Sequence, residues 1–464
     1  MSLKNRQNKQ SFHACQQDEI TLRNITPIDG RYKKQLTNLT HYFSEFAYIR
    51  YRIHVEVEYL ILLSKNKVAQ KLTQKQIGDL RSLYVDFTPA QANEVKSIEL
   101  EINHDMKAIE YFLQRMCKRM KLEQLTPYIH WGITSDDTGN LAYSMALSQC
   151  NSQEIVPVLQ DLLDVLQQIA IQNKKSHLLA RTHGQPAVPT TFGKELINFY
   201  VRLDKQLKKL KNYSFEGKLM GAVGNLSAHR IHFPSIDWVV QSRIFVRSFG
   251  LIPNIHVTQV LPYDNWVSYF QILLTINGII TGLSRDLWTY IMLEEVKLRK
   301  KEGEVGSSTM PQKVNPIDFE NAEGNCEIAN AYFQMYERKL LQSRLQRDLS
   351  DSVVKRTMGT ALAHTVLAWN SLQKGLKKIE FDTETSSQHL SAHYEVLSEA
   401  IQTQLRLKND HDGYEKVKKM TRGKKITKQL FQEIVRTLGL SHFENLSPEQ
   451  YLGYAEELTK DTTL

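Results

Sequence analysis

The 464-residue chain is poor in cysteine and proline and has no long uninterrupted apolar run. Its four cysteines are far apart and form no CxxC pair, which argues against a disulfide framework or a structural zinc site. No HExxH motif occurs, and we interpret the nearest histidines, His229 and His232, as core or surface residues. The longest apolar stretch, 270–283, is too short and too interrupted by polar residues to span a bilayer. We therefore expect no metal site and no membrane partner.

The N-terminal segment, residues 1–20, is polar throughout and lacks the apolar centre of a secretory signal peptide. We interpret it as a mobile tail and expect a cytoplasmic protein. The remaining composition is that of an ordinary soluble chain, with 41% hydrophobic and 23% charged residues. The formal net charge is +9, from 59 Lys and Arg against 50 Asp and Glu, and such an excess suits anionic partners.

Much of the positive charge lies in one segment, residues 406–429, which holds nine Lys or Arg against three Asp or Glu. A solvated face is the favoured interpretation, because no RNA- or DNA-binding signature accompanies the basic residues. Nucleic-acid binding by this segment stays as an alternative, which salt-dependent RNA binding would support.

Proline and apolar spacing together predict an all-α protein. No proline occurs between Pro316 and Pro448, and an interior proline would cost a helix about 3 kcal/mol. Apolar residues alternate four and three apart in two stripes: Ile155, Leu159, Leu162, Leu166 and Ile169, then Leu196, Tyr200, Leu203, Leu207 and Leu210. Such stripes are typical of helices that pack into long bundles. Period-two runs are scarce, so we expect a bundle of unusually long helices.

Three domains follow from the changes in composition along the chain. Residues 21–124 mix helices with a polar opening loop, and residues 125–376 carry the long apolar stripes. Residues 377–464 are again helical but much more charged. No internal repeat is present in the sequence.

Two short polar passages interrupt the helical pattern in the first third of the chain. Asn103, His104 and Asp105 stand together at the start of a predicted helix. Thr134 and Ser135 stand in "HWGITSDDTGN", a run of good helix-capping residues. A structural cap is the simplest interpretation of that run, and a ligand contact is the alternative.

His183 lies in the passage "LLARTHGQPAVPTTFGKE", between turn-forming residues and directly before a predicted long helix. A lone histidine is most often unremarkable. A histidine fixed on a rigid turn is nevertheless well suited to act as a general acid near neutral pH.

The loop 303–316, "GEVGSSTMPQKVNP", sets two serines near one lysine between two predicted helices. It does not match SxxK, the phosphate-binding GxxxxGK[ST] or GxSxG. Gly303 and Gly306 supply flexibility, and Pro311 and Pro316 limit it. We expect a mobile loop that closes over a ligand.

A further passage, "SRLQRDLSDSVVKR", supplies Arg347, Ser352 and Arg356. On one continuous helix the two arginines, nine residues apart, would point about 180° away from each other. If the segment bends, they can act together with Ser352 on a phosphate or a carboxylate, which the arginine fork suits.

These motifs together resemble a known family. "GSSTMPQKVNP" is similar to the signature loop of the fumarase/aspartase superfamily, whose members cleave C–N or C–O bonds and release fumarate. Within it, "TPIDGRY", "NHD", "TSDD", "RTHGQPAVPTT", "GAVGN" and "QRDLSDS" resemble the adenylosuccinate lyases, particularly their longer bacterial form. The likeness runs in order from about residue 25 to the C-terminus.

The resemblance implies three mostly helical domains and a homotetramer with a twenty-helix core, in which each active site draws on three subunits. It implies nucleotide substrates and two reactions of purine synthesis. Adenylosuccinate would give AMP and fumarate, and succinylaminoimidazole carboxamide ribotide would give its carboxamide and fumarate. Neither reaction needs a metal or an organic cofactor.

Site residues follow from the same resemblance. His183 matches the general acid that protonates the departing nitrogen, and Ser307 matches the general base that removes the proton from the succinyl Cβ. His104 and Lys313 match the remaining active-site positions. Matches to substrate-binding positions are Arg31, Tyr32, Asn103, Asp105, Thr134, Ser135, Gln259, Asn315, Asn321, Arg347, Ser352 and Arg356.

The sequence departs from the family pattern at Gln312, where a histidine is frequent, and after Gln259, at Leu261 and Tyr263. These departures affect substrate contacts rather than the reaction class. Two alternatives stay open beside the favoured function: another fumarate-releasing lyase, acting on argininosuccinate, aspartate or malate, and a structural protein that retains the superfamily fold.

Overall fold

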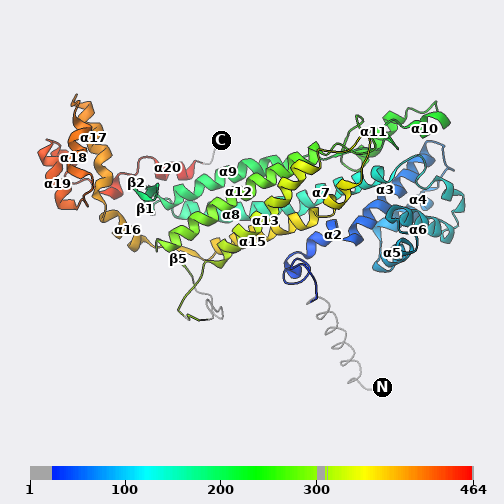
Figure 1. The fold of residues 1–464 in the computed structure, drawn as a ribbon, viewed down its shortest axis with the longest axis horizontal. Coiled ribbons are helices and arrows are strands. Elements are labelled where there is room, and N and C mark those ends of the chain that lie inside the picture. The colour runs from blue at the N-terminus through cyan, green and yellow to red at the C-terminus, as the bar shows by residue number, and fades with distance from the viewer. Residues whose placement is uncertain (1–22, 300–308, 311, 462–464) are drawn as a thin grey trace, which may run out of the picture. The chain divides into compact units, whose positions relative to one another are not determined.

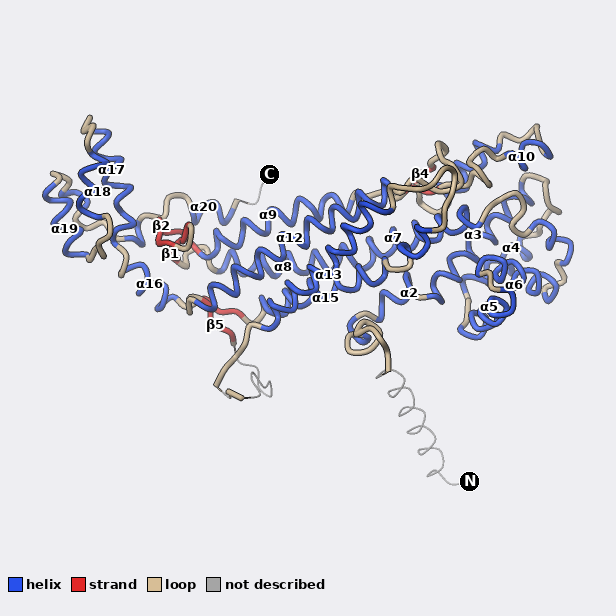
Figure 2. Tube along the Cα trace, viewed as in Figure 1, coloured by secondary structure: helices blue, strands red, loops and turns tan. Residues whose placement is uncertain are grey.

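A computed structural model describes residues 23–299, 309–310 and 312–461 of the chain, and helices dominate it (Figures 1 and 2). The predicted all-α class is confirmed. Within this described part, six short strands pair into three two-stranded sheets, β1–β2, β3–β4 and β5–β6. The tetramer and the domain boundaries stay predictions.

The chain forms two compact units, each built from three segments. Unit 1 comprises Met1–Val158, Lys208–Thr275 and Glu327–Leu367, and unit 2 comprises Leu159–Leu207, Ile276–Cys326 and Ala368–Leu464. Elements that lie wholly in unit 1 are α2 (Thr40–Phe43), α3 (Glu45–Lys65), α4 (Gln74–Val85), α5 (Pro89–Ile102), α6 (Asp105–Arg119), α7 (Ser135–Cys150), β3 (Glu216–Gly217), α10 (Ser227–His232), α11 (Trp238–Ser248), β4 (Ile252–Pro253) and α14 (Ser350–Lys355).

Five long helices contribute residues to both units: α8 (Val156–Gln172), α9 (Phe192–Lys211), α12 (Asp264–Met292), α13 (Ile317–Lys339) and α15 (Met358–Leu376). The indole Nε1 of Trp369 on α15 donates to Asn277 Oδ1 on α12 over 2.9 Å. Apart from Ile155, just before α8, both apolar stripes of the sequence lie on such helices. Leu159, Leu203 and Leu207 are buried as the spacing predicts.

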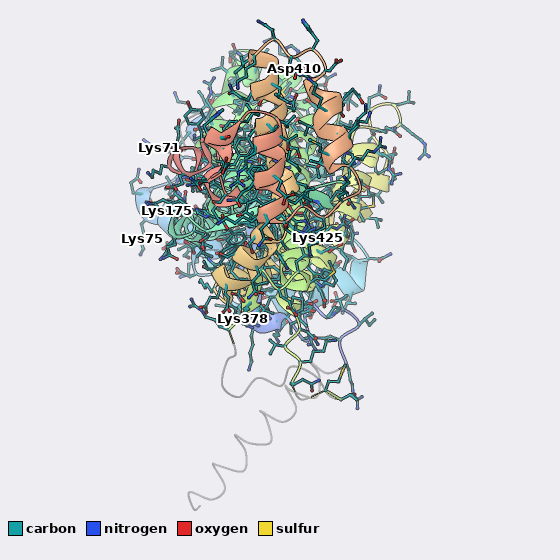
Figure 3. The ribbon with its side chains drawn as sticks, turned by 90° about the vertical axis from the view of Figure 1, so that its left-hand side faces the viewer. Lys71, Lys75, Lys175, Lys378, Asp410 and Lys425 are labelled. Carbon is teal, nitrogen blue, oxygen red and sulfur yellow. The ribbon has the colours of Figure 1, made fainter. Side chains whose placement is uncertain are left out.

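Elements that lie wholly in unit 2 are β1 (His177–Thr182), β2 (Gln185–Thr191), β5 (Val296–Leu298), β6 (Ile379–Phe381), α16 (Thr383–Ser391), α17 (Ser398–Leu407), α18 (Gly413–Thr421), α19 (Lys428–Thr437) and α20 (Ala455–Lys460). The last helices enclose their own apolar core, which includes Leu397, Phe431 and Val435. The basic segment 406–429 runs from the end of α17 through α18 to the start of α19. Figure 3 labels two of its residues, Asp410 and Lys425. Lys416 Nζ forms an ion pair with Asp410 Oδ2 at a distance of 2.6 Å.

Among the described helices, α12 alone is long and apolar enough to cross a membrane by length and composition. It is longer than the apolar stretch noted in the sequence, because helical residues extend on both sides of that stretch. In the structure, 61% of its most apolar window is buried inside the protein. Such burial is typical of a core helix.

Three loops of unit 1 meet where Gly224 touches the loop before α12. Gly224 has a φ of +81°, and a Cβ on it would lie 2.1 Å from the carbonyl oxygen of Val257 and 2.7 Å from that of Thr258. The Thr258 Oγ1 hydroxyl in turn donates to the Gln346 carbonyl over 3.0 Å. Only glycine fits this approach, because a side chain would meet both the backbone oxygens and an unfavourable φ.

Gly224→Ala is predicted to lower the free energy of unfolding by about 2 kcal/mol or more, because it combines a steric clash with strained backbone. Urea denaturation monitored by circular dichroism measures the change. Gly78→Ala is the matched control, since nothing lies within 4 Å of its added Cβ on the exposed side of α4. That control should be neutral or stabilising by up to about 1 kcal/mol. Equal stabilities for the two variants would contradict the close approach.

His229 is a core histidine, one of the two interpretations that the sequence left open, and belongs to an aromatic cluster in unit 1. Its ring is 1% exposed and lies 4.8 Å from the ring of Trp238 and 5.1 Å from that of Trp131. Its Nε2 and the Tyr59 hydroxyl are 2.7 Å apart, and that hydroxyl donates to the Trp131 carbonyl. Burial lowers the pKa of His229 from 6.5 to about 4.

This depressed pKa predicts an acid-sensitive stability. The unfolded chain binds a proton at His229 below its ordinary pKa of 6.5, whereas the folded chain does so only near 4. Stability is therefore lost as the pH falls from about 6.5 to 4, by up to about 1.4 kcal/mol per pH unit from this group. His229→Phe should flatten the urea-denaturation profile over that window, and the exposed His232→Phe should leave it unchanged. A His229→Phe profile as steep as wild type would contradict this account.

Candidate active site

One pocket in unit 1 brings together nine of the sixteen residues predicted for the site. Its volume is about 470 Å³. The nine are Asn103, His104, Asp105, Thr134, Ser135, Gln259, Arg347, Ser352 and Arg356. They come from four separate passages of the sequence, and the fold gathers them around the junction of α5 with α6, the N-terminus of α7, and the loops next to α12 and α14.

The α5–α6 junction orients His104. Asn103 takes the left-handed conformation, with φ 53°, and ends α5, so that the chain turns sharply into α6. His104 is the N-cap of α6, and its Nδ1 accepts the N–H of Lys107 over 3.1 Å. Its side chain is 57% exposed. With Nδ1 occupied as an acceptor, the free Nε2 is the nitrogen that can donate to a ligand.

Asp105 holds two arginines of the pocket wall. Arg52 on α3 donates to Asp105 Oδ2 over 2.9 Å, and Arg356 approaches the same oxygen at 3.8 Å. Burial alone would raise the pKa of Asp105, but the charge and hydrogen bond of Arg52 lower it. The Arg52 guanidinium also lies 4.0 Å from the centre of the Tyr48 ring. Asp105 therefore stays ionised, and it holds Arg52 and Arg356 in place at the pocket wall.

The residues of the "TSDD" passage, at the N-terminus of α7, have different roles: some cap the helix and others line the pocket. The N–H of Thr134 donates to Asp137 Oδ2 over 2.9 Å, so Asp137 takes part in the capping that the sequence suggested. Ser135 faces the pocket as the first residue of the helix. Asp136 is not an ordinary exposed cap: it is 4% exposed, and its Oδ1 accepts Arg347 Nη1 over 2.9 Å. This passage is therefore both a helix start and a wall of the pocket.

The two predicted arginines face one pocket because their segment bends. Arg347 lies in a turn before α14, and Arg356 follows its last residue, so no continuous helix separates them by half a turn. The backbone at Arg347 is fixed by its neighbour, because the Gln346 carbonyl accepts the N–H of Gln259 over 3.2 Å. Gln259 Nε2 donates to the Ala222 carbonyl over 2.8 Å. The bend that the sequence left open is present.

Sequence reasoning missed several residues of the pocket. Arg52, Lys355 and Asp136 line it together with Tyr48 and Glu99. Arg52 had a recognisable signal, since it interrupts a long apolar helix between Tyr51 and Ile53. Lys355 stood next to a predicted residue but carried no motif signal of its own.

Arg31 and Tyr32 do not line this pocket. Arg31 lies over the Tyr32 ring at 6.0 Å. Their neighbours Asp29 and Lys33 line a smaller cavity of about 160 Å³, which shares Arg356 with the main pocket. The opening turn of the chain is thus close to the pocket wall, and a nucleotide role for Arg31 and Tyr32 stays a prediction.

His183 lies in unit 2, on a β-hairpin that the sequence did not predict. β1 and β2 pair antiparallel, and His183 and Gly184 form the two-residue turn between them, with φ values of 54° and 75°. Positive φ at both central positions is the preferred geometry of a tight hairpin, and histidine tolerates it better than most residues. The His-Gly pair was the overlooked signal. The hairpin presents an exposed imidazole at its tip.

The other predicted residues of unit 2 follow the signature loop. Lys313 is exposed and its N–H donates to the Met310 carbonyl over 3.0 Å, and Asn315 precedes α13. Asn321 is exposed on the first turns of α13. Ser307 lies outside the described residues, as do Gly303 and Gly306.

Helix α16 contacts both the His183 hairpin and the segment that leads into this loop. β5, which leads into the loop, pairs with β6, and Ser386 on the following helix α16 donates to the His177 carbonyl of β1 over 2.7 Å. His389 on α16 lies 2.9 Å from the buried carboxylate of Glu295, just before β5. Within unit 2, α16 therefore contacts both the hairpin that carries His183 and the residue just before β5.

The main pocket is suited to an anion. Arg52, Arg347, Lys355 and Arg356 converge on it, and the exposed guanidinium groups can bind phosphate or carboxylate through paired hydrogen bonds. In the part of the chain that the structure describes, no three His, Cys, Asp or Glu side chains cluster as metal ligands would. Cys117, Cys150 and Cys326 are buried free thiols.

Comparison with known proteins bears out the resemblance seen in the sequence. Residues 30–330 match the family described as "Lyase", and residues 343–452 match "Adenylosuccinate lyase C-terminal". The chain is 41% identical over 450 residues to an adenylosuccinate lyase from Haemophilus influenzae, covering 95% of this chain and 98% of that one. It is 43% identical over 457 residues to one from Dictyostelium discoideum, covering 94% and 98%.

A solved structure adds the fold. A fumarate lyase from Mesorhizobium sp. BNC1 aligns with a TM-score of 0.75 at 16% identity, over 92% of this chain and 97% of that chain. At that identity the match concerns the fold alone, and it agrees with the helical architecture. Near-complete coverage by relatives at about 40% identity shows that the chain belongs to the adenylosuccinate lyase family of carbon–nitrogen lyases.

Proposed function

We propose that this chain cleaves adenylosuccinate to AMP and fumarate, and succinylaminoimidazole carboxamide ribotide to its carboxamide and fumarate. It would do so as a cytoplasmic homotetramer. The observation that carries the proposal is the pocket of unit 1. Three passages that resemble the family's motifs meet there with Gln259 around a set of cationic side chains, as the binding of an anionic nucleotide requires.

The proposed chemistry is a β-elimination by general base and general acid. Ser307 removes a proton from the succinyl Cβ, next to a carboxylate, and the resulting carbanion places negative charge on two oxygens. The C–N bond then breaks, and His183 protonates the departing nitrogen. Fixed cations and N–H donors aimed at the developing charge supply the largest stabilisation in such reactions. Lys313 and the N–H groups at the start of α13 are the groups we assign to that task.

Serine is a weak base, so its ionised form needs support. A neighbouring positive charge favours the alkoxide over the hydroxyl. Lys313 is the nearest lysine after the serine pair in the sequence. His104 would orient the substrate through Nε2, because its Nδ1 is already engaged by the backbone.

The predicted residues divide between the two units, and we propose that different subunits complete each site. Unit 1 supplies the anion-binding pocket, and unit 2 supplies His183, Lys313 and the signature loop. This division suits the homotetramer that the family resemblance implies, in which three subunits contribute to one site.

A substrate panel separates this function from its alternatives. The purified protein should release fumarate from adenylosuccinate and from the second purine substrate, and not from argininosuccinate, aspartate or malate. Preferential release from one of the latter would identify another lyase of the superfamily. No release from any substrate would favour a structural role.

Single substitutions test the catalytic assignments. Ser307→Ala and His183→Ala should each lower kcat for adenylosuccinate by about 10²–10⁴-fold, the usual contribution of a positioned proton-transfer group. Steady-state kinetics measure the loss, and circular dichroism checks that each variant folds. The exposed His232→Phe, in unit 1, is the control. A variant that keeps a kcat near wild type would remove its residue from the assigned role.

Mixing the two inactive variants tests the sharing of sites. Mixed tetramers of Ser307→Ala and His183→Ala subunits should recover part of the wild-type activity, because some sites would receive both intact residues from different subunits. Subunit exchange is followed with a mass or fluorescence label. Exchange without any recovery would count against shared sites.

A further inference from the structure

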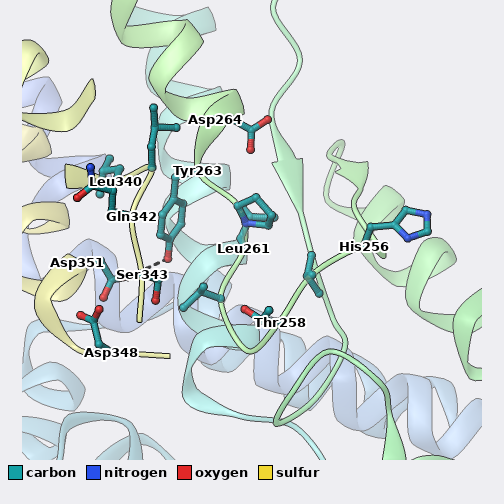
Figure 4. A pocket seen from close by; sticks show the side chains of 14 residues that line it. His256, Thr258, Leu261, Tyr263, Asp264, Leu340, Gln342, Ser343, Asp348 and Asp351 are labelled. Carbon is teal, nitrogen blue, oxygen red and sulfur yellow. Dashed lines mark hydrogen bonds between the residues drawn. The ribbon is translucent and has the colours of Figure 1, made fainter. Parts of the chain in front are cut away.

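Tyr263 is a buried residue next to the candidate pocket. It does not line that pocket and is not one of the predicted site residues. It is 3% exposed, and its hydroxyl accepts the Lys355 ammonium over 2.7 Å and donates to Asp351 Oδ2 over 3.1 Å. Figure 4 shows Tyr263 and Asp351 in the wall of a second cavity, of about 360 Å³, which is lined by the segments 256–264 and 340–351. The hydroxyl also lies 3.4 Å from Asp136 Oδ1.

Asp136 links this hydroxyl to the main pocket. Its Oδ1 accepts Arg347 Nη1 over 2.9 Å and lies 3.5 Å from Lys355 Nζ. Burial alone would raise the pKa of Asp136, but Lys355, Lys218 and Arg347 together lower it, so the carboxylate stays ionised. Burial and the two nearby carboxylates raise the pKa of Tyr263 well above its ordinary value, so the hydroxyl keeps its proton.

Arg347 has the most exposed side chain of this group. The side chains of Asp136, Lys355 and Asp351 are 2%, 6% and 9% exposed, whereas that of Arg347 is 24% exposed. Asp136 and Lys355 also line the main pocket, but Arg347 has a larger exposed fraction there than either of them. A guanidinium held on one side by a carboxylate keeps its remaining N–H groups for a ligand.

We propose that Tyr263 is a positioning residue: its hydroxyl holds Lys355 and Asp351 around Asp136, and Asp136 thereby aims Arg347 at an anionic group of the substrate. The inference rests on the proposed function for the identity of that substrate. The anionic group is a phosphate or a carboxylate, which arginine recognises through the same paired hydrogen bonds. Lys355 and Asp351 are also ion-paired with each other at 2.7 Å, and Lys355 Nζ lies 3.5 Å from Asp136. Loss of the hydroxyl removes the group that contacts all three side chains, so the Lys355–Asp351 pair can shift relative to Asp136 and change the position of Arg347.

Tyr263→Phe tests this with a matched control. The variant keeps the ring that packs 4.6 Å from Trp266, and it removes only the hydroxyl. Tyr269→Phe makes the same change at another buried tyrosine of unit 1, whose hydroxyl has no hydrogen-bond partner among the described residues. We expect Tyr263→Phe to raise KM for adenylosuccinate about 5–20-fold with kcat within about twofold, the pattern of lost uniform binding. Tyr269→Phe should match wild type.

Calorimetry with AMP and with succinate identifies the anionic group and does not depend on turnover. A weaker affinity of Tyr263→Phe for AMP alone assigns Arg347 to the phosphate, and a weaker affinity for succinate alone assigns it to a carboxylate. Unchanged affinity for both, or equal effects of Tyr263→Phe and Tyr269→Phe, would overturn the proposal. A wild-type protein that binds AMP but releases no fumarate would refute the proposed function and leave this test intact; one that binds neither ligand would overturn both.

A double variant tests the route through Arg347. Arg347→Lys removes the guanidinium group. If Tyr263 acts by positioning that group, the double variant Tyr263→Phe with Arg347→Lys should have nearly the same KM as Arg347→Lys alone. Additive effects would overturn that route. Asp351→Asn serves as the second single variant should Tyr263→Phe alter the circular dichroism spectrum. It should reproduce the rise in KM because it weakens the ion pair that holds Lys355 next to the Tyr263 hydroxyl and Asp136.

Discussion

The carboxylates of Asp136 and Asp137, buried at the start of α7, are the constraint on which the candidate pocket depends. Asp137 Oδ1 accepts the ammonium of Lys218 over 2.9 Å and the backbone N–H of Met220 over 2.8 Å. Asp136 holds Arg347 from a sequence distance of 211 residues. Two adjacent carboxylates thus join the loop after β3 and the segment before α14 to one helix end. Removing one partner of a buried ion pair strongly destabilises the folded protein, because the other charge is left buried and unpaired. Each of these ion pairs is therefore needed to keep its loop against the start of α7.

The balance of charge explains why such a cluster can be buried. Asp136, Asp137 and Asp351 carry three negative charges, and Lys218, Lys355 and Arg347 carry three positive ones, so the group is neutral. Buried charges persist when they are paired and hydrogen-bonded. The proposed general acid has a different setting, since His183 stands at the exposed tip of a hairpin. Rigid binding groups and accessible proton-transfer groups are a common division in enzymes that close around a substrate.

Local patterns of the sequence predicted what depends on local physics. The stripes around Leu159 and Leu203 predicted α8 and α9, and the lack of proline predicted the helices after Pro316. Motifs predicted nine residues of the pocket, although only the fold shows that they meet. The hairpin under His183 had a local signal, its His-Gly turn, which was overlooked. Two features were out of reach: the bend between Arg347 and Arg356, and the buried role of Asp136. Each depends on contacts with distant segments, which neither spacing nor composition records.

The central claim is that a nucleotide binds in the cationic pocket of unit 1 while groups from unit 2 act on it. The most direct measurement is a crystal structure of the full-length His183→Ala variant with adenylosuccinate bound. The account predicts the substrate's anionic groups against Arg347 and Arg356, with Ser307 close to the succinyl Cβ. Adenylosuccinate bound elsewhere, or bound in this pocket with Ser307 far from that carbon in every subunit, would contradict it.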